Sequence, residues 1–231
     1  MAKKPPKDAA PEKAQLVLTV DAQTMGAVDA GARIAAAMSG GGVVAVILPR
    51  FDMDGPTYDS AVTTLVPFIQ EAGAAALLDG VEASQTMGRI DADGLLVEAK
   101  GESWVDDVLD LLDRANGQRS IGLYGQFSRD SALTAGDVAP DMIHLGPLAR
   151  DIKPEPHAKN LVLAEWWAQM IEVPCLIAAG NSLESVSDAV ATRAEFVVLS
   201  QAVFGAEDPA AAVAKALNMI EAEGPELEFA D

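Results

Sequence analysis

The chain has 231 residues, of which half are hydrophobic, and its 35 Asp and Glu outnumber its 16 Lys and Arg to give a formal net charge of −19. This length suits one large core, such as a single barrel of ~250 residues, and the apolar content argues against global disorder. The negative charge excludes nucleic acids and anionic membranes as expected partners, because both would be repelled.

Short apolar runs alternate with helical stretches, which predicts eight strand–helix units between two tails. We expect a flexible tail over residues 1–13, a barrel over 14–222 and an acidic tail over 223–231. The expected strands are 16–20, 43–48, 75–78, 93–97, 120–124, 142–145, 174–178 and 196–199. The expected helices are 25–38, 58–72, a stretch ending near Gly88, one capped by Ser103 and ending at Asn116, one beginning at Ser128 or Asp130, 158–171, one capped by Ser182, and a last one beginning at Pro209.

The expected strands are continuously apolar rather than alternating, which indicates burial on both faces and hence a parallel sheet. Eight such units predict a (β/α)8 TIM barrel in one domain. A doubly wound open sheet is the alternative fold. The single cysteine, Cys175, the lack of a signal-peptide pattern and the lack of a run of ~20 apolar residues predict a cytoplasmic protein without a membrane partner.

In a barrel of this kind the loops after strands seven and eight form the usual phosphate site. Gly180 and Ser200 follow those two expected strands directly. Glycine lets the backbone approach a ligand closely, and a helix beginning at Ser182 would offer unpaired N–H groups. The expected phosphate-binding residues are Gly146, Lys153, Gly180, Asn181, Ser200 and Gln201. A phosphorylated small molecule is therefore the expected partner, and the oligomeric state stays open.

Positive charge gathers on the same face, because five of the 16 Lys and Arg follow expected strands. Such focusing suits an anionic ligand. These residues are Arg50, Lys100, Arg129, Arg150 and Lys153. We expect Arg50 and Lys153 to be the candidates for a catalytic role.

Asp79 ends the third expected strand and is the candidate ligand for Mg²⁺, which usually takes one or two carboxylates together with substrate oxygens. Glu98 or Glu102 is the candidate for a second carboxylate. His144 lies within the sixth expected strand, where a packed core residue is expected.

Three segments carry a resemblance to the thiamine-phosphate synthase family. Residues 140–147 resemble its Asp-Tyr-Ile-x-x-Gly-Pro motif, residues 174–182 its Pro-Val-Val-Ala-Ile-Gly-Gly-Ile motif, and residues 197–209 its motif ending in Ala-x-Asp-Pro. That family joins an aminopyrimidine pyrophosphate to a thiazole phosphate with Mg²⁺. The resemblance implies that Gly180 and Ser200 hold the thiazole phosphate, that Lys153 grips phosphates, and that Asp79 binds Mg²⁺.

The chain departs from the family pattern on the opposite side of the expected mouth. The Gln-x-Arg-x-Lys motif is replaced by residues 47–51, where only Arg50 could compensate, and Leu78 stands where the family has Asn before the metal aspartate. Residues 98–101 lack the second metal aspartate, and Tyr124 replaces a serine. Because losing one electrostatic donor alone costs ~10²–10³ in rate, these changes bear directly on activity.

Three functions remain open at this point. The first is a divergent thiamine-phosphate synthase. The second is a non-catalytic or regulatory barrel that binds a small phosphate and has lost the pyrimidine-pyrophosphate site. The third is a different enzyme on the same scaffold, such as the related thiazole tautomerase, against which Gln126 counts, because that group has a histidine after strand five.

Overall fold

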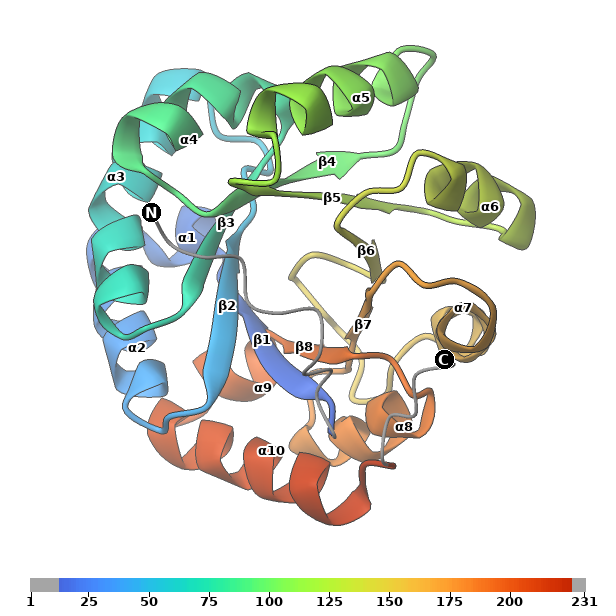
Figure 1. The fold of residues 1–231 in the computed structure, drawn as a ribbon. Helices are drawn as coiled ribbons and strands as arrows, with labels where there is room; N and C mark the ends of the chain where they lie inside the picture. Colours follow the sequence, from blue (N-terminus) through green and yellow to red (C-terminus); the bar gives the residue numbers. More distant parts are fainter. Residues whose placement is uncertain (1–12, 226–231) are drawn as a thin grey trace.

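Eight parallel strands close into a barrel in the computed structural model, which describes residues 13–225 (Figure 1). Pairing of the last strand with the first closes the ring, so the predicted (β/α)8 barrel is confirmed and the open sheet is excluded. The strands are β1 (Gln15–Thr19), β2 (Val43–Leu48), β3 (Ala75–Asp79), β4 (Gly94–Glu98), β5 (Ser120–Gly125), β6 (Met142–Leu145), β7 (Cys175–Ala178) and β8 (Phe196–Leu199).

Helices cover the outside of the ring of strands (Figure 1). The α-helices are α1 (Ala22–Met25), α2 (Ala27–Met38), α3 (Gly55–Glu71), α4 (Ser84–Ile90), α5 (Trp104–Ala115), α6 (Arg129–Asp137), α7 (Ala158–Met170), α8 (Val186–Ala191), α9 (Gln201–Phe204) and α10 (Pro209–Glu223). Two 3-10 helices, η1 (Val81–Ala83) and η2 (Leu183–Ser185), precede α4 and α8. No helix between residues 13 and 225 is long and apolar enough to cross a membrane.

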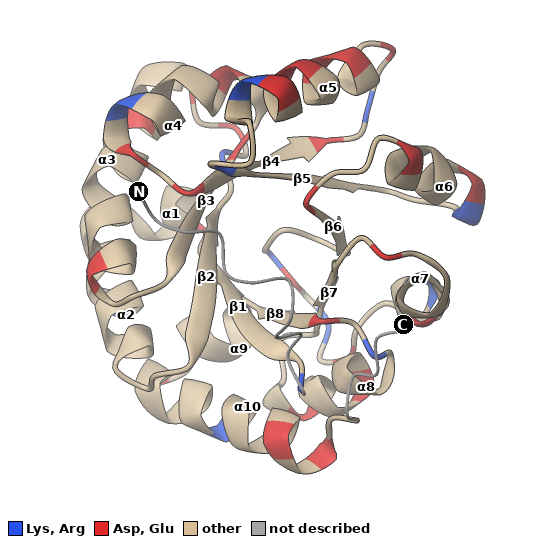
Figure 2. Ribbon diagram, viewed as in Figure 1, with Lys and Arg blue, Asp and Glu red and all other residues tan. Residues whose placement is uncertain are grey.

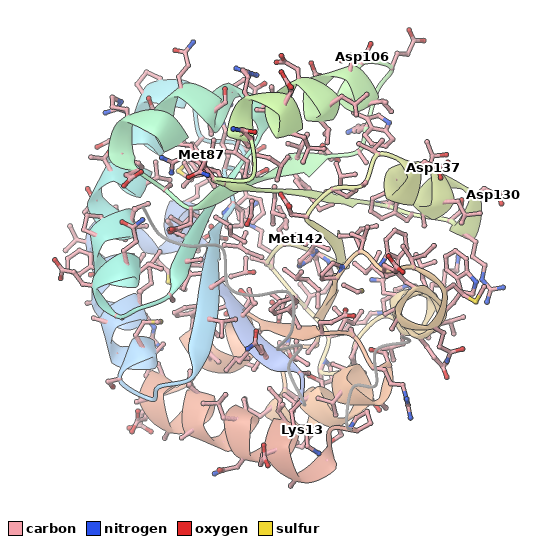
Figure 3. All side chains as sticks on the ribbon, in the orientation of Figure 1. Lys13, Met87, Asp106, Asp130, Asp137 and Met142 are labelled. Carbon is pink, nitrogen blue, oxygen red and sulfur yellow. The ribbon has the colours of Figure 1, made fainter. Side chains whose placement is uncertain are left out.

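The core has two layers because each strand buries both faces. Side chains such as Leu18, Val46 and Ile177 point outward and pack under the helices. A smaller cluster that includes Ile47, Leu96 and Leu176 fills the barrel itself. Figure 3 shows Met142 near the centre of the ring, whereas Asp106, Asp130 and Asp137 lie on the outer helices. Acidic residues are spread over these outer helices, with α5, α6 and α10 among them (Figure 2).

Three predicted helix starts are wrong. Gly26, at φ 77°, separates α1 from α2, so the helix expected from Met25 is two helices. Helix α3 begins three residues before Tyr58, because the Asp54 carboxylate caps it by accepting from the Thr57 N–H. No α-helix begins at Ser182; a 3-10 turn follows it, and its hydroxyl donates to the Glu184 carboxylate instead of capping.

The two expected tails lie mostly outside the described residues. At their edges, the Lys13 ammonium donates to the Gly224 carbonyl at 2.6 Å, just after α10 ends. The ordered barrel therefore brings its first and last described residues together at the side of the molecule where the strands begin.

Candidate functional site

A cavity of about 1110 Å³ lies at the carboxyl ends of the strands. The loops after β2, β5, β6 and β7 and the last residues of β3 and β4 line it, as expected for a barrel of this kind. Its lining includes Phe51 after β2, Asp79 at the end of β3, Glu98 at the end of β4, Tyr124 and Gln126 from β5 and its loop, Gly146 and Lys153 after β6, and Gly180 after β7.

The backbone N–H groups that were expected to bind phosphate already have partners within the chain. The Gly180 N–H donates to the Ser185 hydroxyl at 2.9 Å, and the Asn181 N–H donates to the Lys153 carbonyl at 2.8 Å. The Gln201 N–H donates to the Asp151 carboxylate at 3.4 Å. Two of these three acceptors belong to the loop between β6 and α7, residues 146–157, here called the β6–α7 loop.

Two glycines let this loop lie against β7. A methyl group on Gly180 would stand 2.0 Å from the Pro154 carbonyl oxygen, and one on Gly146 would stand 2.6 Å from the Ala178 side chain. Gly146 also has φ 117°, a region that L side chains rarely adopt. The space that glycine leaves beside the backbone is therefore taken by the β6–α7 loop of the chain and not left for a ligand.

Two buried oxygens beside these contacts have no hydrogen-bond partner among residues 13–225. One is the Ser200 hydroxyl, on a residue that is only 6% exposed, and the other is the second oxygen of the Asp151 carboxylate. Burial raises the pKa of Asp151. The Ser200 hydroxyl and the second Asp151 oxygen thus lie without hydrogen bonds beside the contact between Asp151 and the Gln201 N–H.

Arg150 fastens the β6–α7 loop across the mouth. Its guanidinium donates to the Asp21 carboxylate at 2.7 Å and to the Gln23 side-chain oxygen at 2.9 Å, and lies 3.8 Å from the centroid of the Phe51 ring. Burial alone would raise the pKa of Asp21, but the hydrogen bonds from Arg150 and Thr24 outweigh it and lower that pKa. Arg150 has φ 60°, which is uncommon outside glycine.

The five expected cations do not gather as free charges. Arg50 donates to the Met53 carbonyl at 3.0 Å and lies 3.5 Å from the Glu82 carboxylate, and its side chain does not line the cavity. Lys100 lies 4.0 Å from Glu98, and Arg129 stacks over Trp166. Lys153 lines the cavity and, within the described chain, forms no ion pair. Of the two candidates for a catalytic role, the structure brings Lys153 to the mouth and turns the Arg50 side chain away.

Asp79 lies in a hydrogen-bond network on the opposite side of the mouth. One carboxylate oxygen accepts from the Tyr124 hydroxyl at 2.9 Å and the other from the Arg50 backbone N–H at 2.9 Å. The Tyr58 hydroxyl accepts from the Asp79 backbone N–H at 2.8 Å and donates to the Leu48 carbonyl at 2.6 Å. Burial raises the pKa of Asp79, and burial also raises the pKa of Tyr124.

This arrangement does not fit a Mg²⁺ ion held by Asp79. Mg²⁺ in proteins is usually held by one or two carboxylates together with water and substrate oxygens, whereas both oxygens of this single carboxylate already accept hydrogen bonds from within the fold, and burial raises its pKa. Across the described part of the chain, no group of three or more His, Cys, Asp or Glu side chains is arranged to hold a metal. The function proposed below therefore uses no metal.

Sequence reasoning missed several residues that shape this site. Asp151 and Asp21 were not expected in the site, and Arg150 was expected only as one of five cations on the same face. Nothing in the sequence pattern identified Tyr58 as a partner of Asp79, because the two are 21 residues apart and meet only through the packing of α3 on β3. The sequence showed that Tyr124 stands where the family has a serine, and the structure adds the hydrogen bond from its hydroxyl to Asp79.

The family model for thiamine monophosphate synthase matches residues 16–203 of the chain. Among curated relatives, the thiamine-phosphate synthase of Rhodospirillum centenum is 28% identical over 184 residues, which cover 78% of this chain and 86% of that protein. The thiamine-phosphate synthase of Erythrobacter litoralis is 29% identical over 97 residues, so that match spans 41% of this chain and 46% of that protein.

The fold has a clear counterpart among solved structures. Thiamine phosphate pyrophosphorylase from Pyrococcus furiosus superposes with a TM-score of 0.71 and covers 91% of this chain and 96% of its own. The identity is 18%, so this likeness shows the fold alone.

Proposed function

We propose that this chain, which belongs to the thiamine monophosphate synthase family, binds a small phosphorylated ligand of the thiazole phosphate class in its barrel mouth without synthase turnover. One observation carries the binding half of this proposal. The Asp151 carboxyl group already accepts a hydrogen bond from the Gln201 N–H, just after β8, at 3.4 Å. The position therefore accommodates a carboxyl oxygen, and the buried Ser200 hydroxyl beside it has no partner in the described chain.

The Asp79 network supports the second half. Departure of pyrophosphate requires strong charge neutralisation, and the family uses Mg²⁺ for it. Here Asp79 is tied to Tyr124 and to the Arg50 backbone, and the Arg50 side chain points toward Glu82. The groups that the coupling reaction needs are thus held by the fold in other contacts.

Thermal stabilisation tests the binding half. Thiazole phosphate at 100 times its Kd should stabilise the fold by about 2.7 kcal/mol, and the unphosphorylated thiazole alcohol should give almost none. Ser200→Ala should weaken binding about fivefold through loss of one hydroxyl hydrogen bond, whereas Ser39→Ala, on an exposed residue at the end of α2 where the chain enters β2 on the opposite side of the barrel, should leave it unchanged. Equal stabilisation by both compounds would contradict a phosphate site.

A divergent synthase is the second candidate, favoured by family membership and by Lys153 in the cavity lining. Incubating the protein at high concentration with the aminopyrimidine pyrophosphate, the thiazole phosphate and Mg²⁺ separates the two. Our proposal expects no thiamine phosphate above the uncatalysed level. Product that disappears in Lys153→Ala would establish the synthase instead.

A further inference from the structure

The β6–α7 loop makes three separate attachments at the place where the phosphate is proposed to bind. Asp151 holds the Gln201 N–H through its carboxylate, and the Lys153 carbonyl holds the Asn181 N–H. The Asp151 carbonyl also accepts from the Asn181 side-chain amide at 3.3 Å. A ligand phosphate would need these same two backbone N–H groups, so loop and ligand cannot both have them.

The fit of the loop against β7 leaves no room for a ligand oxygen at Gly180. A single methyl group there would overlap the Pro154 carbonyl, and the backbone of Glu155 lies within 2.9 Å of the same point. A second cavity, of about 720 Å³, is lined by Asn181 and Gln201, and the loop residues Arg150, Asp151 and Ile152 line both cavities. The loop therefore lies between the cavity of about 1110 Å³ and the residues that carry these backbone donors.

The Ser200 hydroxyl is an independent indication that the loop occupies a position that a ligand would otherwise fill. Ser200 is 6% exposed, and its hydroxyl finds no partner in residues 13–225 even though Asp151 is close enough to bond to the next residue. The second oxygen of Asp151 is also buried without a partner. Buried polar atoms usually have hydrogen bonds. A phosphate has more acceptor oxygens than a carboxylate, so it could accept from the Ser200 hydroxyl as well as from the Gln201 N–H.

On the basis of the proposed function, we infer that the β6–α7 loop is a built-in competitor for the phosphate site, with the Asp151 carboxylate occupying the position of the ligand's phosphate. Arg150 holds the loop in this closed state through Asp21, Gln23 and the Phe51 ring. Ligand binding requires release of the loop, so the affinity measured for any phosphate is lowered by the stability of the closed state.

The first measurement is the Kd of inorganic phosphate for the full chain by calorimetry. Asp151→Ala should bind phosphate about tenfold more tightly than the unchanged protein, because the Asp151 side chain, 3.4 Å from the Gln201 N–H, no longer competes for it. Glu155→Ala removes the same charge from an exposed position on the same loop that also lines the cavity, so it measures general charge repulsion and should tighten the Kd less than Asp151→Ala does. A melting curve verifies folding, and Asp151→Asn, which keeps the shape of the side chain, provides a second reading of intermediate size.

The second measurement is amide hydrogen exchange with and without phosphate. Displacement of the loop predicts that phosphate speeds exchange over residues 150–157 in the unchanged protein. Slower exchange there would show that the loop covers the ligand rather than competing with it, and would overturn the inference.

The outcomes separate this inference from the function on which it rests. Phosphate binding by the unchanged protein with no gain in Asp151→Ala overturns the competitor alone. An equal gain in Glu155→Ala also overturns it, since general charge repulsion would then account for the effect. Absence of binding in all the variants removes the phosphate site itself and both proposals with it. Binding that appears only after Asp151→Ala supports both.

Discussion

On both sides of the barrel mouth, polar groups have hydrogen-bond partners within the chain, but the partners come from different kinds of structure. On the β7–β8 side a loop supplies the contacts, through Asp151 and the Lys153 carbonyl. On the β3–β5 side the contacts come from side chains on strands and on a packed helix, namely Asp79, Tyr124 and Tyr58. Loops open at far lower free energy than strands in a core do. The proposed ligand would therefore have to displace only a loop on the first side, whereas the contacts on the second side are part of the fold.

The proposed function, phosphate binding without synthase turnover, rests on this difference between the two sides. Backbone N–H groups after β7 and β8 persist with almost any sequence, so a phosphate site there depends on little more than glycine and a small hydroxyl residue. Charge neutralisation at β3–β5 depends on individual side chains. Here Tyr124 has made one of them, Asp79, into a structural group.

The largest effect is expected on the β3–β5 side, from Tyr58→Phe. The lost hydroxyl serves two buried backbone groups, the Asp79 N–H and the Leu48 carbonyl, so we expect a loss of about 3 kcal/mol in the free energy of unfolding. Tyr124→Phe is the matched control, because it removes one hydrogen bond to Asp79 and should cost about 1–2 kcal/mol. Urea titration measures both. A cost for Tyr58→Phe no larger than that for Tyr124→Phe would contradict a structural role for this side.

His144 lies on β6 between the two sides and should make the stability depend on pH. Burial lowers the pKa of its ring to about 4, below the ordinary value of 6.5. The unfolded chain therefore takes up the proton first as pH falls, and stability should drop between pH 6.5 and 4, by up to about 3 kcal/mol. Thermal unfolding from pH 7 to 4 measures the drop.

His144→Gln provides the control for this pH dependence, since its amide does not titrate. Asp79 and Asp151 have raised pKa values and act with the opposite sign, so only the difference between the two proteins isolates the histidine. An identical pH profile for both proteins would show that His144 is not responsible.

Gly180→Ala should open the loop side while leaving the network around Asp79 intact. The added methyl group would overlap the Pro154 carbonyl, so the loop must move, at a cost of about 2 kcal/mol. Amide exchange at Asn181 should become faster, because its N–H loses the Lys153 carbonyl. Gly88→Ala is the control: it lies within α4 with open space around it and should stabilise the fold by about 0.5–1 kcal/mol. Unchanged exchange at Asn181 would contradict the tight contact.

The sequence predicted the barrel well because eight apolar runs and their spacing depend on local pattern. Gly180 and Ser200 were placed correctly after β7 and β8 for the same reason. The α-helix start predicted at Ser182 is wrong, because the Ser182 hydroxyl donates to the Glu184 carboxylate and a 3-10 helix follows.

The hydrogen-bond partners of the site residues could not be predicted from the sequence, for a different reason. The bonds from Arg150 to Asp21 and from Gln201 to Asp151 span 129 and 50 residues. Each depends on loop conformation, including a positive φ at Arg150 that no sequence pattern marked. Local patterns identify where a site is, whereas long-range contacts decide what fills it.

The smallest effect is expected from Arg150→Ala, which loosens the loop without touching the proposed phosphate donors. The ion pair is partly exposed on the arginine side, but Asp21 is buried and keeps its bonds from Thr24, so we expect a cost of about 1 kcal/mol. Arg114→Ala, which removes an exposed pair with Asp110, should cost about 0.3–0.5 kcal/mol.

The pH dependence of that cost identifies its source. Arg150 lowers the pKa of Asp21, so this stabilisation is present above the ordinary value of 3.8 and is lost as pH falls through the lower folded value. The difference between the unchanged protein and Arg150→Ala should therefore be constant near neutral pH and shrink below pH 3.8. A difference that persists in acid would mean that the arginine acts through its stacking on Phe51 instead. Packing on Phe51 rather than the ion pair with Asp21 would then hold the loop in place. An anion that competes with the Asp21 carboxylate for Arg150 would not release it.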